Sequence, residues 1–197
     1  MNFPKTWLIA DTHFGHKAIC DYESRPFKSA KEMDESLIAN WNNTVSKQDT
    51  IYVLGDFSFH GTDETQNIIK RLTGNKILVM GNHDSRSVNW WINAGFKEVY
   101  KHPVIVDEFF ILSHEPMYVN TNMPYANIFG HVHNRPEYHK HTAQTFCVCV
   151  ERINYMPIDF DEVKAVMQGH GGSSLELSEF LDIKKADRMK RKEAGKK

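Results

Sequence analysis

Short apolar runs recur along this chain, and five of them lead directly into a polar cluster. These runs span residues 7–10, 51–54, 77–80, 109–112 and 128–129. Segments of about 4–8 residues rich in β-branched and aromatic types are typical of buried strands. In open α/β sheets, ligands gather outside the carboxyl ends of the strands. The pattern therefore predicts a sheet protein whose polar clusters converge on one rim.

Helical patterns lie between the early runs. Residues 30–45 carry an amphipathic stripe formed by Met33, Leu37, Ile38 and Trp41. Shorter helices are expected at 65–72 and 87–94, the second with Ser87 as its N-cap. The alternation of strand and helix in the first half predicts βαβ units and a parallel sheet.

Strands dominate from about residue 98 onward. They are predicted to form a second, mixed sheet packed on the first, with strands at 98–101, 103–106, 109–113, 126–130 and 145–152. A helix is expected near 159–168. A length of 197 residues suits one domain. We assign residues 1–183 to that domain and 184–197 to a basic C-terminal tail, helical or frayed from about Leu175.

The composition limits the class of protein. Hydrophobic residues make up 41% of the chain, but no apolar run approaches the ~18 residues of a membrane span. The first apolar stretch is too short for a signal peptide and ends in Asp11, so we expect a soluble, cytoplasmic protein with no membrane partner. Three cysteines without a CxxC pair argue against a disulfide framework or a zinc knuckle.

Charge is distributed unevenly along the chain. The net charge is −1, but residues 184–197 carry eight Lys or Arg and two acidic residues, a net +6, which leaves −7 for the remainder. An acidic body that binds phosphates needs local positive charge, and metal ions would supply it. The eleven His fit this idea, because imidazole is the commonest metal ligand.

The polar clusters have the composition of a metal centre. Their Asp, Asn and His residues are Asp11, His13, Asp56, Asn82, His114, His131 and His133. The first and last pairs of this set are each two residues apart, so in extended chain their side chains point the same way. A glycine precedes three of the clusters, at positions 55, 81 and 130, where it allows a sharp turn and close approach to an ion. Seven ligands are too many for one ordinary site with an open position. They suit two ions, roughly 3.5–4 Å apart, that share a bridging carboxylate.

The order of these motifs along the chain is DxH, GD, GNHD, H and GHxH. With each motif after an apolar run, this order resembles the calcineurin-like metallophosphoesterase superfamily over residues 11–133. The resemblance implies an α/β fold, a four-layer α/β/β/α sandwich of two mixed sheets with flanking helices. It also implies a metal-dependent hydrolase with a binuclear centre.

The resemblance assigns a role to each residue of the set. The implied ligands are Asp11, His13 and His133 for one metal, Asn82, His114 and His131 for the other, and Asp56 as the bridge. His83 would lie beside the leaving oxygen, and Asp84 would orient it. Two dications allow hydroxide attack near neutral pH, and an imidazole can protonate the leaving group. The mixed ligands suit Mn, Fe, Ni, Co or Zn, of which we expect Mn²⁺.

The second motif departs from one subfamily of this superfamily. Ser/Thr protein phosphatases and their diadenosine-tetraphosphatase relatives carry Asp-Arg-Gly shortly after the GD, whereas this chain has Phe59-His60-Gly61. The departure argues against protein phosphatase activity, and the small size resembles compact bacterial and phage phosphodiesterases. We expect the substrate to be a phosphodiester, either a nucleotide or another small phosphate ester. The alternatives are a nuclease or nucleic-acid end-processing enzyme of the same superfamily, and a non-catalytic scaffold with this fold.

Several side chains near the motifs are candidates for substrate binding, namely Arg25, Arg135, His16 and His60. The planar fork of Arg suits phosphate oxygens. Tyr118 and Tyr125 lie between two motifs, where a ring could stack on a base, although packing is the simpler expectation. The basic tail could contact nucleic acid, although a solvated tail is simpler, and the sequence leaves the oligomeric state open.

Overall fold

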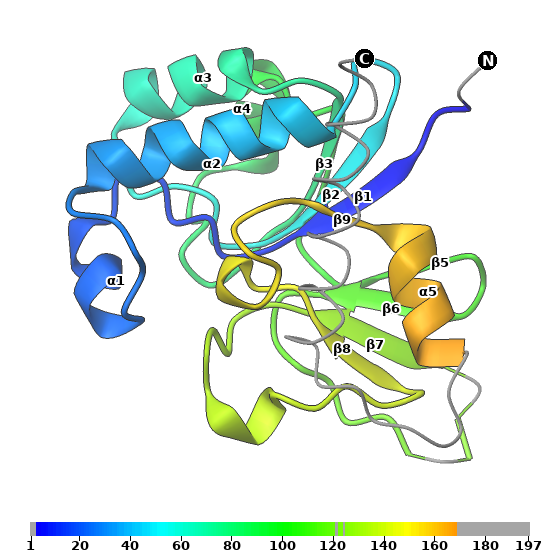
Figure 1. The fold of residues 1–197 in the computed structure, drawn as a ribbon. Helices are drawn as coiled ribbons and strands as arrows, with labels where there is room; N and C mark the ends of the chain where they lie inside the picture. Colours follow the sequence, from blue (N-terminus) through cyan, green and yellow to red (C-terminus); the bar gives the residue numbers. More distant parts are fainter. Residues whose placement is uncertain (1–2, 121, 124, 169–197) are drawn as a thin grey trace, which may run out of the picture.

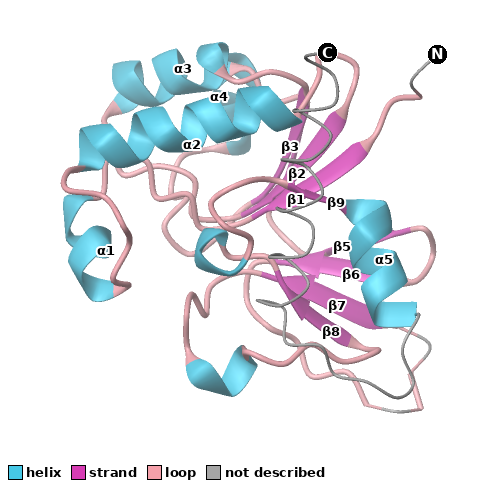
Figure 2. Ribbon diagram, in the orientation of Figure 1, coloured by secondary structure: helices cyan, strands magenta, loops and turns pink. Residues whose placement is uncertain are grey.

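The computed structural model describes residues 3–120, 122–123 and 125–168, which form two sheets with flanking helices (Figures 1 and 2). The first sheet has the strand order β4-β3-β2-β1-β9. Its strands are β1 (Thr6–Ile9), β2 (Thr50–Leu54), β3 (Asn75–Val79), β4 (Glu98–Tyr100) and β9 (Ile158–Asp159). Strands β1 to β4 are parallel, and β9 is antiparallel to β1. The predicted fold class, two mixed sheets with flanking helices, is confirmed.

The second sheet has the strand order β5-β6-β7-β8. Its strands are β5 (Val104–Val106), β6 (Phe110–Ser113), β7 (Ala126–Phe129) and β8 (Thr145–Cys147). It is mixed, because β5 is antiparallel to β6 while β6, β7 and β8 are parallel.

The sequence placed two of these segments wrongly. The strand expected at 98–101 joins the first sheet, where Tyr100 pairs with Val79 of β3. The strand expected at 145–152 ends at Cys147, and a 3-10 helix, η2 (Val150–Arg152), follows it. The chain turns there to return to the first sheet through β9.

Three helices cover the outer face of the first sheet (Figure 1). They are α2 (Ala30–Thr44), α3 (Thr62–Arg71) and α4 (Val88–Ala94). Ser87 caps α4, as predicted, by accepting a hydrogen bond from the backbone N–H of Trp90 at 3.2 Å. The sequence did not indicate the short helix α1 (Lys17–Tyr22). The predicted last helix, α5 (Phe160–Gln168), contacts β1, β9 and β8, so it touches both sheets. A second 3-10 helix, η1, spans Pro136–Tyr138.

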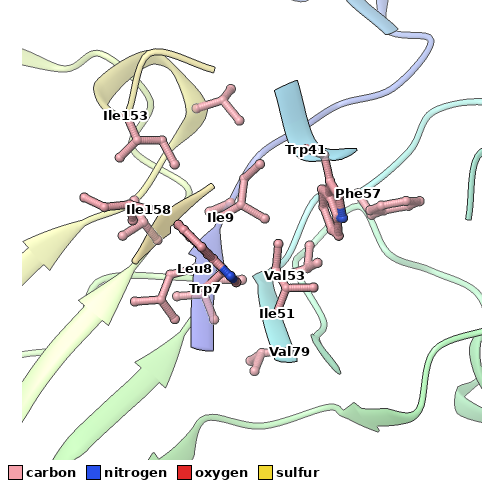
Figure 3. Close-up of a cluster of buried hydrophobic side chains, with 14 of the residues drawn as sticks. Trp7, Leu8, Ile9, Trp41, Ile51, Val53, Phe57, Val79, Ile153 and Ile158 are labelled. Carbon is pink, nitrogen blue, oxygen red and sulfur yellow. The ribbon is translucent and has the colours of Figure 1, made fainter. Parts of the chain in front are cut away.

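A large hydrophobic core joins the sheets and the helices. Figure 3 shows part of it, with Trp41 of α2 and Phe57 of the loop after β2 among side chains of β1 and β2. Trp41 is fully buried, and its indole N–H donates to the carbonyl of Thr73 at 3.0 Å. All three cysteines are buried and carry free thiols. Within the described residues, no helix has the length and apolarity to cross a membrane.

The two sheets meet at the end of β1. The N–H of Ala10 donates to the carbonyl of Val148 at 3.0 Å, and the N–H of Val150 donates back to Ala10 at 3.1 Å. The register also aligns the strand ends, with the pairs Ile9–Val53, Leu54–Val79 and Ser113–Phe129. The parallel strands of each sheet therefore end at a common rim. The tail at 184–197 and the segment from Leu175 lie outside the described residues.

Candidate metal centre

All seven candidate ligands lie in the loops that follow the aligned strand ends. The strands that precede them are β1 for Asp11 and His13, β2 for Asp56, β3 for Asn82, β6 for His114, and β7 for His131 and His133. The structure brings them together in two groups of donor atoms that share Asp56.

The first group contains Asp11, His13 and His133. Nε2 of His13 and Nε2 of His133 each lie 3.9 Å from Oδ1 of Asp11, and these residues form a group that could hold a metal ion. His133 also lies within hydrogen-bond distance of Glu151, with 3.1 Å between Nδ1 and Oε1. A carboxylate only accepts hydrogen bonds, so Nδ1 carries the proton and Nε2 keeps its lone pair for an ion.

The second group contains Asn82, His114 and His131. Oδ1 of Asn82 lies 2.9 Å from Nε2 of His114 and 3.1 Å from Nδ1 of His131. The two imidazole nitrogens are themselves 3.1 Å apart. Nδ1 of His114 lies 2.9 Å from the carbonyl oxygen of Leu54. This contact fixes the proton on Nδ1 and leaves the lone pair of Nε2 free to bind an ion.

Asp56 faces both groups with different oxygen atoms. Its Oδ2 lies 3.5 Å from Nε2 of His13, in the first group. Its Oδ1 lies 3.6 Å from Nε2 of His114, in the second group. The carboxylate thus has the geometry that a bridge between two ions requires.

The donor set fits divalent metal ions. Oδ1 of Asp11 and Nε2 of His13 are buried and have no hydrogen-bond partner, and an unsatisfied buried polar atom is costly unless another ligand meets it. Burial alone would raise the pKa of Asp11, but the neighbouring imidazoles of His13, His114 and His133 lower it below its ordinary value. Asp11 is therefore held as a carboxylate among imidazoles, the form in which it can bind a cation.

Comparison with known proteins assigns the family. The family model for calcineurin-like phosphoesterases matches residues 4–196. The chain belongs to this family. It is thus a metal-dependent phosphoesterase. Side chains that could hold a metal ion lie where its sequence motifs converge, namely Asp11 with His13 and His133, and Asp11 with Asp56 and His114.

Relatives of this phosphoesterase occur in archaea, bacteria and phages. An uncharacterized protein of Methanocaldococcus jannaschii is 33% identical over 177 residues, which cover 85% of this chain and 94% of that protein. A protein of unknown function from Aquifex aeolicus has a solved structure with a TM-score of 0.66 and 27% identity, covering 83% of this chain and 100% of that one. The gene 66 protein of Mycobacterium phage L5 is 33% identical over 82 residues, 40% of this chain and 39% of that protein.

The backbone of the phosphoesterase is unusual at these ligands. Asp and His residues at five of the seven positions have φ between 48° and 68°, namely Asp11, His13, Asp56, His131 and His133. The expectation of extended chain at the two spaced pairs was therefore wrong, although each pair does meet the site. Left-handed backbone at residues other than glycine is strained and is typical of functional sites.

Close backbone packing explains two of the glycines. At Gly55, where φ is 81°, a Cβ would lie 2.4 Å from Nδ1 of His114. At Gly81, a Cβ would lie 2.4 Å from Oδ1 of Asp56. A side chain at either position would displace a candidate ligand. Both glycines therefore allow the close approach that the sequence predicts.

Asp84 does not orient His83, contrary to the prediction. The buried carboxylate of Asp84 accepts hydrogen bonds from the backbone N–H groups of Asp56 at 2.8 Å, Gly81 at 2.9 Å and Phe57 at 3.1 Å. Burial raises its pKa to about 6, against the effect of these donors. Asp84 therefore ties the loop after β2 to the loop after β3, and this fixes the position of Asp56.

His83 remains beside the two groups, with its side chain half exposed. Its Nε2 lies 4.0 Å from Oδ2 of Asp56, and its backbone N–H donates to Oδ1 of the same carboxylate at 3.0 Å. The imidazole is thus at the mouth of the site, where a substrate could reach it.

Arg25, a predicted substrate contact, lies behind the site in the structure. There it cannot contact a substrate on the rim. Its guanidinium is fully buried and donates to the main-chain oxygens of Asp11 at 2.8 Å and Thr12 at 3.0 Å. It also forms an ion pair with Glu151 at 2.6 Å. Glu151, which the sequence did not indicate, thereby connects Arg25 to His133. Arg25 and Glu151 are 126 residues apart in the sequence, and no local pattern marks such a pair.

A second buried arginine shapes the loop after β7. Arg152 donates to the main-chain oxygens of His133, Tyr138 and Arg135, each at 2.6 Å. Arg135 itself is exposed, as its proposed contact with substrate requires.

The two remaining candidates for substrate binding, His16 and His60, differ in position. His16 lies in the site, with its Nδ1 3.2 Å from Nδ1 of His13. His60 lies beneath the turn at Gly15, with its Nε2 2.7 Å from Oδ2 of Asp34. Asp34 also accepts the backbone N–H of Gly15 at 2.9 Å, so His60 supports the first loop.

Proposed function

We propose that the protein is a binuclear phosphodiesterase, with two divalent ions held by the seven ligands at the rim. The single observation that carries this proposal is the geometry of Asp56, whose two oxygens face the two donor groups. In this arrangement Asp11, His13 and His133 would hold one ion. Asn82, His114 and His131 would hold the other. Mn²⁺ is the proposed ion, since mixed oxygen and imidazole ligands suit it, and the proposed compartment is the cytoplasm.

Asp56 and His83 have separate proposed roles in the hydrolysis. When bound, a pair of divalent ions supplies hydroxide from water near neutral pH and neutralises charge on the phosphoryl oxygens. Asp56 would keep the two positions at a fixed separation. His83, at the mouth of the site, would protonate the leaving oxygen, because an imidazole can release a proton near neutral pH.

The arrangement of arginines supports a diester as the substrate. A monoester dianion carries an additional charge, which an Arg close to the ions would balance. The guanidiniums of Arg25 and Arg152 are committed to main-chain oxygens. Arg135 is exposed on the loop after β7, which also carries His131 and His133, and there it would contact the second substituent of a diester.

Substrate class can be tested with matched esters on the Mn²⁺-loaded protein. Bis(4-nitrophenyl) phosphate and 4-nitrophenyl phosphate share a leaving group and differ in charge. We expect a higher kcat/KM for the diester, and Arg135→Ala should lower it without changing the metal content. Faster turnover of the monoester would overturn the diester proposal. Cleavage of oligonucleotides with steep salt dependence would instead favour the nuclease alternative.

The role of His83 can be tested with two leaving groups. His83→Ala should retain both ions and lower kcat by ~10²–10⁴-fold on a diester with a poor leaving group. The loss should be smaller for nitrophenolate, which needs less protonation. Equal losses on both diesters would contradict a proton transfer from His83.

A further inference from the structure

Phe59 lies at the mouth of the metal centre with 41% of its surface exposed. It follows the predicted bridging residue Asp56 by three positions. Its backbone N–H donates to the carbonyl of Phe14 at 2.8 Å, so its main chain is fixed against the loop that carries His13. Single exposed aromatic residues are common, and exposure alone therefore says little. The contacts of the ring are more informative.

Three histidines of the site surround the ring of Phe59. The ring is nearly parallel to His16, with centroids 4.1 Å apart and an angle of 17°. It is also nearly parallel to His13 at 5.0 Å. His83 is tilted by 48° and lies 4.9 Å away. The aromatic ring therefore lies directly beside the predicted proton donor.

The same distances show how His13 and His16 are placed relative to the ring. His13 and His16 are 5.3 Å apart. If they covered opposite faces of Phe59, their separation would approach the sum of their distances from its centroid, and it is much shorter. Both imidazoles therefore lie toward one side of the ring. With 41% of its surface exposed, Phe59 still has area on which a planar group that enters the site could stack.

We propose that Phe59 stacks on the nucleobase of the substrate, so that the diester is a nucleotide. This inference rests on the proposed phosphodiesterase function and adds the substrate class. Because Phe59 lies beside His83, the stacked base belongs to the leaving side of the ester. Every nucleobase has a π-face, so stacking favours a base over no base without selecting one sequence. Offset or tilted stacking at about 4.5–7 Å between centroids is the geometry that aromatic rings prefer.

A simpler role for Phe59 is to cover His13 and keep its imidazole in place. The two roles predict different results when aromaticity is removed but apolar volume is kept. Phe59→Leu keeps an apolar cover and loses the flat ring, whereas Phe59→Tyr keeps both. Tyr118→Leu is a matched control, because Tyr118 is an aromatic residue that is 89% exposed in the loop after His114.

The test compares binding of AMP and ribose 5-phosphate to the full-length, Mn²⁺-loaded protein by calorimetric titration. The two ligands share their phosphate and sugar and differ in the base. We expect wild type to bind AMP about 5- to 150-fold more tightly, the range for stacking of one base. Phe59→Leu should lose most of this preference and keep its metal content and its affinity for ribose 5-phosphate. Phe59→Tyr and Tyr118→Leu should retain the preference.

Two results would overturn this role of Phe59. One is equal binding of AMP and ribose 5-phosphate by wild type. The other is a preference that survives in Phe59→Leu or disappears in Tyr118→Leu. Hydrolysis of bis(4-nitrophenyl) phosphate by the same preparations keeps the two proposals separate. Its absence in wild type would refute the phosphodiesterase, whereas its presence without a preference for AMP would refute only the stacking.

Discussion

The two halves of the candidate metal centre differ in how deeply their side chains are buried. In the first half Asp11 and His13 are almost fully buried, at 0% and 3% exposure. In the second half Asn82 and His131 are exposed, and only His114 is buried. The halves share Asp56, so the contrast does not arise from different bridging groups.

The support behind the two halves differs in the same direction. In the first half His133 is held by Glu151, which also pairs with the buried Arg25. Burial alone would lower the pKa of His133, but the hydrogen bond to Glu151 and the charge of Asp11 raise it above its ordinary value. In the second half the exposed His131 lies 3.1 Å from Asn82 and from His114, which are themselves candidate ligands. From the burial of Asp11 and His13 and the contact of His133 with Glu151, we infer that the first half binds its ion more tightly than the more exposed second half.

The largest effect is expected from Asp56→Ala, which removes the group common to both halves. We expect both ions to be lost on dialysis and the activity to fall well beyond the ~10–100-fold typical of residues that only support a ligand. Metal analysis and diester hydrolysis on the same sample measure this. Two retained ions with full activity would contradict the bridging role.

The next largest effect is a difference in metal content between His131→Ala and His133→Ala, which each remove one ligand from a different half. We expect His131→Ala to keep the ion of the first half. Two proposed ligands of that ion, Asp11 and His13, are buried, and the third, His133, is held by Glu151. His133→Ala should lose that ion and retain only the weaker one. Metal content after dialysis against the same chelator distinguishes them. Equal loss in both variants, or the reverse order, would remove the contrast between the halves.

A smaller effect is expected from Glu151→Gln, which removes the charge behind His133 while keeping the size of the side chain. We expect affinity for the more tightly bound ion to fall ~10–100-fold, the usual effect of losing a partner of a ligating His. Glu23→Gln is the comparison for charge alone, since Glu23 also lies near His133 and raises its pKa, but accepts the backbone N–H of Asn134, at 3.2 Å. Similar losses in the two variants would point to general charge rather than to the contact with His133.

The smallest effect on the ions is expected from Asp84→Asn, which acts on the loops. The amide NH₂ of Asn cannot accept a hydrogen bond, so at least one of the three backbone N–H donors would lose its acceptor. A buried donor without a partner costs about 1–3 kcal/mol in the free energy of unfolding. Urea denaturation of the metal-free protein measures this cost, with the exposed Asp63→Asn as control. An unchanged midpoint would show that Asp84 does not tie the loops together.

The sequence predicted the strands and the seven candidate ligands because both depend on local patterns. Apolar runs mark the strands, and the register of parallel strands brings the ends of neighbouring runs together. By contrast, β9 is only two residues long, too short for a recognisable pattern. The strand at 98–100 pairs with the first sheet through a contact that no local signal encodes.

The residues behind the ligands could not be predicted for a related reason. Glu151 and Arg25 meet only in the folded chain, and Asp84 bonds to backbone groups rather than to its sequence neighbour His83. The left-handed backbone at Asp11 and Asp56 is likewise set by the loops around it. Only the preceding Gly55 gave a local signal of a tight turn.

Titration of Mn²⁺ into the metal-free protein by calorimetry tests the unequal two-ion centre most directly. We expect two ions per chain, bound in two separable steps, with the weaker step absent in His131→Ala and the tighter step weakened in Glu151→Gln. A single ion per chain, or two steps of equal affinity that both variants alter alike, would contradict it.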